Sequence, residues 1–238
     1  MKFFSKDQKT KLNKIKHEEC IDRKGLRQHL GKYEITFPDC SMNFSKIKIK
    51  IKDAVLEYEY RGTSEYLDER VGSRAVRYLY GTRIKHFGKC TFDKNKGLPK
   101  NKYMTLIQYR GVESGIETEY EIKRENVKNT IVLSSLMDVY EFVYLLYTSD
   151  LSPYISKDKK TVYFKNKRKK IVLSILSPYM YDAIGESSFD ISYELEKFSE
   201  NGFCLIIKTD KIWIEDTDRS RPIFITFPMI FGKFSKNK

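Results

Sequence analysis

Hydrophobic and polar residues alternate one by one from residue 46 onward, which is the pattern of a β-strand with one buried face. Ile47, Ile49 and Ile51 alternate with lysines, so the three isoleucines fall on one side of the strand. After Asp53 the apolar residues shift to even-numbered positions, beginning with Leu56. We therefore expect a turn or a β-bulge at this point, followed by a second or bent strand.

The second half of the chain repeats the strand pattern at short intervals. Turn-forming pairs such as Asn201-Gly202 separate the apolar runs, as in an antiparallel sandwich. The predicted strands cover residues 104–109, 116–122, 130–133, 140–147, 161–164, 171–176, 188–195, 203–208 and 223–227. We predict an all-β, antiparallel β-sandwich-like fold.

The start of the chain differs from this pattern. Residues 6–30 carry a few apolar side chains among many charges, a weak helical pattern that Gly25 interrupts. We expect a short basic arm with weak helical character, mobile or loosely docked. The expected regions are this arm at residues 1–30, a β-rich part at 31–103, a β-sandwich module at 104–230 and a basic tail at 231–238.

One helical turn is predicted among the strands. The Asp210 carboxylate can accept hydrogen bonds from backbone amides two and three residues further on, which starts a helix. This turn would place Trp213, the single tryptophan, in the core. An exposed indole ring would instead suit stacking on carbohydrate.

The charge of the chain favours an anionic partner. Lys and Arg number 45 against 32 Asp and Glu, a formal net charge of +13. Nucleic acid, an anionic polysaccharide or a membrane surface would fit this surplus, although a lysine-rich composition produces it without any ligand. No apolar run reaches the roughly 20 residues of a membrane span, and we expect no signal peptide.

Motifs for catalysis or metal binding are missing from the sequence. The three histidines lack metal-binding spacing, and the four cysteines form no Cys-x-x-Cys pair, which predicts buried free thiols or, in an exported protein, disulfides. Gly88-Lys89 is followed by Cys90 where a phosphate-binding loop needs Ser or Thr, and Ser187 has no nucleophile motif. Glutamates 113, 117, 119 and 121 share one strand face, which is usually solvated. We predict no catalytic residue, metal or cofactor.

Several segments, in this order, resemble a known kind of bacterial module. The resembling segments are residues 107–109, 115–117, 127–133, 177–187, 192–195, 203–208, 210–216 and 219–223. Together they make residues 104–228 similar to the β-rich segment of secreted RHS-repeat, wall-associated and DNRLRE-domain proteins. Two positions depart from that pattern, Arg221 before Pro222 and the sequence Thr226-Phe227-Pro228.

This resemblance implies architecture more than activity, because the segment in that family looks like a folded spacer. It implies an extracellular or cell-surface location and a partner that is another protein or a surface assembly. The expected lack of a signal peptide leaves a cytoplasmic location open. The resemblance also draws attention to residues for which we predict structural roles: Asp182, Gly185, Asp210, Trp213, Arg219 and Pro222. An ion pair between Asp182 and Arg219 is expected to tie the Gly185 turn to the last strand.

The basic run at residues 157–170 is the strongest candidate for partner contact. Its lysines and arginine could bind phosphates, and Tyr163 or Phe164 could stack on bases, although a solvated hairpin has the same composition. Asn166-Lys167 is the expected hairpin tip. The predicted anion or nucleic-acid contacts are Lys165, Lys167, Arg168, Lys169 and Lys170.

Three functions remain open at this point. We expect a non-catalytic structural or accessory module related to bacterial surface proteins. The alternative is a basic cytoplasmic protein that binds nucleic acid through residues 157–170 and 70–89. A polysaccharide-active enzyme using strand carboxylates is the third reading.

Overall fold

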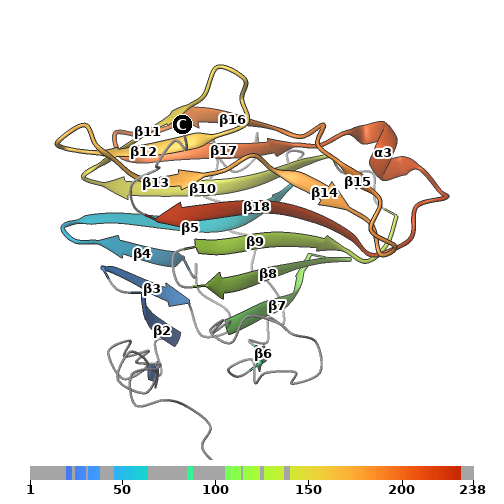
Figure 1. The fold of residues 1–238 in the computed structure, drawn as a ribbon, viewed down its shortest axis with the longest axis horizontal. Helices are drawn as coiled ribbons and strands as arrows, with labels where there is room; N and C mark the ends of the chain where they lie inside the picture. The colour runs from blue at the N-terminus through green and yellow to red at the C-terminus, as the bar shows by residue number, and fades with distance from the viewer. Residues whose placement is uncertain are drawn as a thin grey trace, which may run out of the picture.

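Two antiparallel β-sheets make up most of the computed structural model (Figure 1). The structure describes residues 20–22, 25–30, 32–37, 46–63, 85–87, 105–113, 115–123, 126–136 and 140–231. Across these ranges the single helix is α3 (Lys211–Glu215), and no helix is long and apolar enough to cross a membrane. The all-β, sandwich-like fold predicted from strand patterning is confirmed.

The first sheet has eight strands in the spatial order β1-β2-β3-β4-β5-β10-β17-β16. Its members are β1 (Cys20–Asp22), β2 (Gly25–Leu30), β3 (Tyr33–Phe37), β4 (Ile47–Ile51), β5 (Ala54–Thr63), β10 (Glu141–Ser149), β16 (Ser192–Lys197) and β17 (Gly202–Lys208). β1 and β2 lie where the sequence predicted weak helical character, so this part of the arm is strand instead. β5 pairs with β10, so strands on both sides of residue 104 share one sheet.

The second sheet has ten strands. Eight of them follow the order β11-β12-β13-β18-β9-β8-β7-β6, while β14 pairs with both β15 and β18. Its members are β6 (Lys85–Phe87), β7 (Thr105–Glu113), β8 (Ile116–Lys123), β9 (Asn126–Leu133), β11 (Leu151–Ile155), β12 (Val162–Asn166), β13 (Ile171–Ile175), β14 (Tyr179–Tyr181), β15 (Ser187–Ser188) and β18 (Ile223–Phe231). β13 and β14 pair with successive parts of β18.

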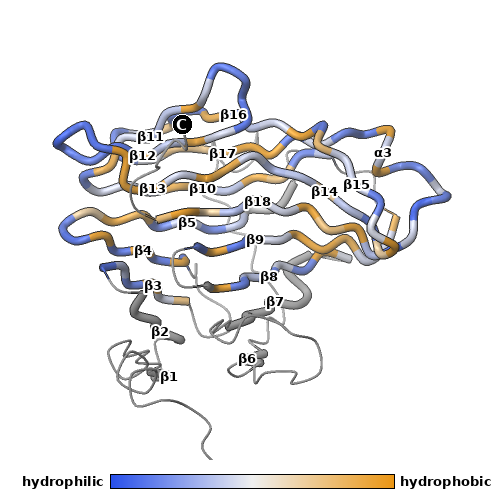
Figure 2. The backbone as a smooth tube through the Cα atoms, viewed as in Figure 1, coloured by the Kyte–Doolittle hydropathy of each residue, from blue (hydrophilic) through white to orange (hydrophobic). Residues whose placement is uncertain are grey.

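The core lies between the two sheets. In β4 the isoleucines are buried and the lysines between them are exposed, as the alternation predicts, and the strand turns at Lys52. The Tyr144 ring lies 5.3 Å from the Phe227 ring, which joins β10 to β18 across the core. The Tyr58 hydroxyl donates to Asn129 Oδ1 at 3.2 Å, also between the sheets. Alternating apolar and polar positions are visible along the strands in Figure 2.

The structure breaks one predicted strand. Residues 188–195 alternate like a single strand, but β15 ends at Ser188 and β16 begins at Ser192. The chain crosses from the second sheet to the first between them, because β15 pairs with β14 whereas β16 pairs with β17. Hydrophobic alternation continues through the crossing, since Ile191 is buried in the common core.

Candidate nucleic-acid interface

The basic run at residues 157–170 forms two turns at opposite ends of β12 rather than one patch. Both turns are hydrophilic loops in Figure 2, one between β11 and β12 and the other between β12 and β13. At about 3.3 Å per residue, the five residues of β12 hold the turns about 15 Å apart. Phe164 is buried in the core, whereas Tyr163 is half-buried on the opposite side of the strand.

Asn166 organises the turn at residues 166–170. Its Oδ1 accepts hydrogen bonds from the backbone amides of Arg168 at 3.0 Å and Lys170 at 3.1 Å, and the predicted hairpin tip is confirmed. Lys169 has φ of 56°, in the left-handed region. Arg168, Lys169 and Lys170 are exposed, and none has an ion-pair partner in the part of the chain that the structure describes. The turn therefore holds three cations on an ordered backbone.

The remaining two predicted contact residues are already engaged. Lys167 Nζ lies 2.8 Å from the Asp150 carboxylate, and this hydrogen bond, together with the Asp150 charge, raises the pKa of Lys167. Lys165 Nζ lies 4.2 Å from the centroid of the Tyr154 ring, a cation–π contact. Tyr154 in turn stacks on Tyr163, with ring centroids 5.1 Å apart and planes at 26°. A pair of rings thus lies beside the basic turn.

Lysines in the other turn, residues 156–160, hold the chain where it crosses between the sheets. Lys159 Nζ forms an ion pair with Glu194 at 3.3 Å. Lys160 Nζ donates to the carbonyl oxygens of Phe189, at 2.7 Å, and Ile191. These two cations are therefore part of the packing of the protein.

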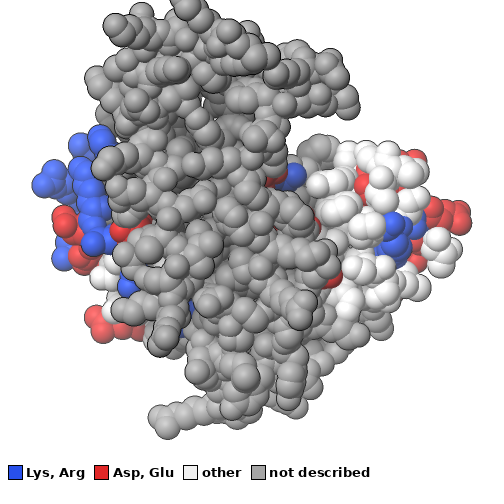
Figure 3. Space-filling view, turned by 90° about the horizontal axis from the view of Figure 1, so that it is seen from below, with Lys and Arg blue, Asp and Glu red and all other residues white. Residues whose placement is uncertain are grey.

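Seen from below, Lys and Arg side chains gather at the end of the molecule that lies on the left in Figures 1 and 3, together with Asp and Glu (Figure 3). The turn at residues 166–170 lies at this same end, where β12 meets β13.

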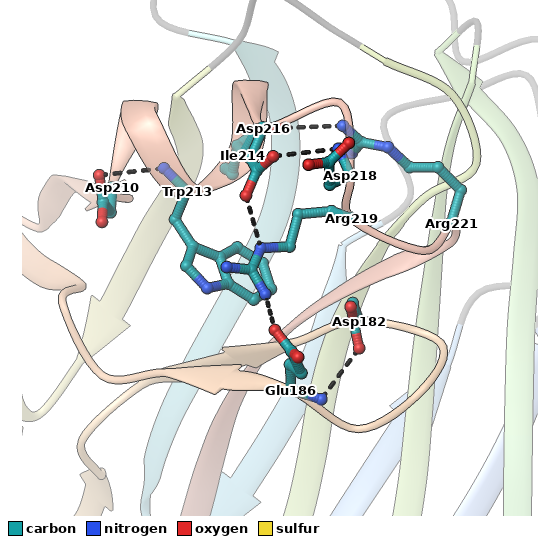
Figure 4. A network of polar contacts seen from close by, with 9 residues as sticks. All are labelled: Asp182, Glu186, Asp210, Trp213, Ile214, Asp216, Asp218, Arg219 and Arg221. Carbon is teal, nitrogen blue, oxygen red and sulfur yellow. Dashed lines mark hydrogen bonds and ion pairs between the residues drawn. The ribbon is translucent and has the colours of Figure 1, made fainter.

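Asp182 organises a second turn, between β14 and β15 (Figure 4). This carboxylate is only 1% exposed, and its Oδ1 accepts from the backbone amides of Ile184 at 3.1 Å and Glu186 at 2.9 Å. Gly185 has φ of +93°, a conformation that a side chain would strain. Asp182 and Gly185 therefore shape this turn.

Arg219 ties this turn to the segment before β18, but through a different acid from the one expected. Its guanidinium pairs with Glu186 and lies 3.3 Å from the Asp216 carboxylate (Figure 4). The expected ion pair with Asp182 is wrong, because the Asp182 carboxylate is turned toward backbone amides. Arg219 also stacks over the Trp213 ring, 4.8 Å from its centroid.

Asp210 caps α3 as predicted, since its Oδ1 accepts from the Trp213 amide at 3.3 Å. Trp213 packs at the margin of the core and is only half-buried, while Ile214 is the residue of α3 that is fully buried. Arg221 Nη2 donates to the Ile214 carbonyl at 2.6 Å, and desolvation lowers the pKa of Arg221. Pro222 follows Arg221 through a cis peptide bond just before β18.

No group of three His, Cys, Asp or Glu side chains that could hold a metal occurs among the described residues. Glu117, Glu119 and Glu121 are half-buried along β8, on the face of that strand away from the core. Cys204 is a buried free thiol, as expected, and the other cysteine side chains lie outside the described residues. The same holds for all three histidine side chains and for residues 70–84, 88 and 89 of the alternative nucleic-acid surface.

An aromatic group that sequence reasoning missed lies along β14. The Tyr179 and Tyr181 rings are 6.1 Å apart at 24°, and Tyr181 stacks on Phe224 at 4.8 Å and 15°. Phe189, which is 66% exposed, lies 6.3 Å from Tyr179. The alternation of two tyrosines was the available signal. Only the register of β14 against β18 brings Phe224 beside them.

Fold and surface together define an antiparallel β-sandwich protein with basic and aromatic groups near one sheet edge. The chain is 29% identical over 126 residues to a protein named tRNA3(Ser)-specific nuclease WapA from Bacillus spizizenii. The match covers 50% of this chain but 5% of that relative, so the chain spans a small part of its length. No protein-family model matches the chain.

This similarity corrects two expectations. The chain was expected to be a non-catalytic module and no enzyme, but the bacterial protein to which half of it is similar is a named nuclease.

Proposed function

We propose that this chain takes part in a nuclease-type activity on RNA and contacts the RNA with the hairpin β12–β13. The observation that carries the proposal is the turn at residues 166–170, where three exposed cations without ion-pair partners among the described residues stand on an ordered backbone. The stacked rings of Tyr154 and Tyr163 begin about two residues from this turn. Cations that bind phosphates and rings that stack on bases are the two parts of a single-strand RNA site.

The similarity supports RNA as the substrate class, because the name of the matched relative states a tRNA specificity. A substrate of this kind also agrees with the net charge of +13. Nucleic acid, the alternative partner that the sequence suggested, is therefore the partner we propose.

The binding test is a titration of the full chain with tRNA at several salt concentrations. Lys169→Gln/Lys170→Gln should weaken binding and reduce the slope of log K against log salt by about 1.5, since each lost phosphate contact removes about 0.7 to 0.9. The control variant Lys50→Gln/Lys211→Gln removes the same charge from exposed lysines elsewhere and should retain most of the slope. Equal losses in both variants would refute a localised site and indicate attraction by net charge alone.

The cleavage test follows end-labelled tRNA incubated with the full chain. Discrete fragments that weaken in Lys169→Gln/Lys170→Gln would support a nuclease-type activity that uses this hairpin. Intact tRNA that is still bound would restrict the role of the chain to holding RNA. If the chain neither binds nor cleaves tRNA, the proposal is overturned.

The proposal also includes a shared ancestry with RHS-type surface proteins, which residues 104–228 resemble, and a location at the cell surface. External protease applied to whole cells of the native host should then digest this protein. Digestion only after lysis would contradict the surface location and leave the RNA proposal standing.

A further inference from the structure

The ring pair beside the basic turn lies on the outer face of the second sheet. Tyr163 pairs with Ser174, and Ser174 pairs with Ile230 near the end of β18. Directly paired residues of neighbouring strands point to the same side of a sheet. Tyr163 therefore shares its face with Ile230, opposite to the buried Met229 and Phe231.

The second aromatic group lies on this same face. Tyr179 pairs with Thr226, and Tyr181 pairs with Phe224. Thr226 and Phe224 are four and six residues before Ile230, and even spacing along a strand keeps side chains on one face. At about 3.3 Å per residue, Tyr163 lies about 13 Å from Tyr179 and about 20 Å from Tyr181 in the direction of β18.

Lys128 lies on β9, across β18 from both aromatic groups, and its side chain reaches the second group. It pairs with Pro228, which is midway between Ile230 and Thr226 on β18. Lys128 Nζ is 5.5 Å from the centroid of the Tyr181 ring. Burial opposes its charge, but neighbouring Tyr181, Tyr179 and Glu121 raise the net pKa of Lys128, so it is a cation at neutral pH.

Hydrogen bonds fix the backbone around Phe189, while its ring is exposed to solvent. Lys160 Nζ donates to the carbonyls of Phe189 and Ile191, and the Asp190 amide donates to Ser188 Oγ at 3.2 Å. A large apolar ring that is 66% exposed gains stability when it is covered. Its fixed backbone gives a planar ligand a site that needs little ordering on binding.

We infer that the outer face of the second sheet binds one single strand of RNA along β18, with bases stacked at Phe189 and Tyr179 and at the Tyr154–Tyr163 pair. Lys128 holds a phosphate beside the Tyr179 station, and the turn at residues 166–170 holds phosphates beside the Tyr154–Tyr163 station. This inference rests on the proposed function, because it extends the same RNA site across the sheet.

The arrangement of groups favours RNA over a neutral polysaccharide. Cations and rings lie side by side at both ends of the face, with the basic turn next to Tyr163 and Lys128 next to Tyr181. This arrangement matches a strand whose phosphates and bases alternate. A neutral sugar chain would gain from the rings but not from the cations.

The test uses the full chain and unstructured uridine oligonucleotides of about four and about twelve nucleotides, the lower and middle range of single-strand sites. Phe189→Ala should weaken binding of the longer strand about fivefold or more, because one base stack is lost. Phe189→Tyr keeps a ring and should restore the affinity. Lys128→Gln should lower the salt slope by about 0.7 for the longer strand. Lengthening the strand should improve wild-type affinity more than that of Phe189→Ala, because only wild type engages both stations.

Ile212→Ala is the matched control, because it removes an apolar side chain that is 82% exposed on α3 and should leave binding unchanged. If wild type binds the RNA and Phe189→Ala binds it equally well, this inference fails and the hairpin proposal stands. If wild type binds no RNA, both fail. If Phe189→Ala weakens binding of a neutral glucose hexasaccharide and not of RNA, the rings belong to a sugar site and the inference is overturned.

Discussion

Single side chains that accept hydrogen bonds from backbone amides define the turns of this protein. Asp210, Asn166 and Asp182 each accept from amides two to four residues further along the chain. Such contacts are local, so the role of Asp210 followed from the sequence. The partner of Arg219 did not, because the choice between Asp182 and Glu186 depends on how the turn faces β18.

The Asp182 carboxylate should be important for stability. Asp182→Ala removes two hydrogen bonds from a buried carboxylate and leaves two amides unsatisfied, so it should lower the free energy of unfolding by about 2 to 4 kcal/mol. Asp182→Asn keeps an oxygen acceptor and should cost about 1 kcal/mol. Urea unfolding of both variants measures the difference. Equal losses would show that the charge of Asp182, and not its acceptor oxygen, matters.

At the scale of elements, two prolines lie at strand positions where the neighbouring strand is absent or interrupted, so no backbone amide hydrogen is needed there. Pro153 lies in β11, the edge strand of the second sheet, where a missing amide hydrogen is tolerated. Pro228 lies inside β18, and its carbonyl accepts from Leu176 between β13 and β14. The nitrogen of Pro228 faces the same neighbour as its carbonyl, which is where the partner strand is interrupted. Hydrophobic periodicity does not predict which neighbouring strand a residue pairs with, and it predicted neither β11 nor β14.

The hairpin β12–β13 carries a conformational cost at Lys169. Lys169→Asn should raise the free energy of unfolding by about 0.5 to 1 kcal/mol, because Asn tolerates the left-handed region better than Lys does. Lys170→Asn removes the same charge and should change stability by less than about 0.5 kcal/mol. Urea unfolding compares the two variants. An equal gain in both would assign the effect to charge repulsion instead of backbone conformation.

At the scale of the whole molecule, the two sheets bury several tyrosine hydroxyls in the core between them. They also bury the Cys204 thiol in a smaller, separate cluster. Burial raises the pKa of Tyr120 to about 12 and that of Cys204 to about 12, and it raises the pKa of Tyr144 and Tyr193 well above the ordinary value. The folded protein thus holds these protons more tightly than the unfolded chain does.

Stability should therefore fall in alkaline solution. Groups whose pKa is raised on folding contribute fully below the unfolded pKa, about 9 for Cys and 10 for Tyr, and their contribution is lost as pH rises toward 12. Tyr193→Phe should make this decline shallower by up to about 1.4 kcal/mol per pH unit. It should also cost about 1 kcal/mol at neutral pH, because the Tyr193 hydroxyl donates to the Leu176 carbonyl. Urea unfolding from pH 8 to 11 is the measurement, and a slope identical to wild type would contradict the burial argument.

The sequence by itself determined what depends on near neighbours along the chain. Alternation identified β4 and most strands of both sheets, and local hydrogen bonding identified the Asp210 cap and the hairpin tip at Asn166. Tertiary structure decided what depends on register between distant strands. It divided one basic run between two turns, gave Arg219 its partners and placed Phe224 beside Tyr181. The physical reason is that periodicity fixes which face a side chain occupies, whereas strand pairing fixes which residues meet on that face.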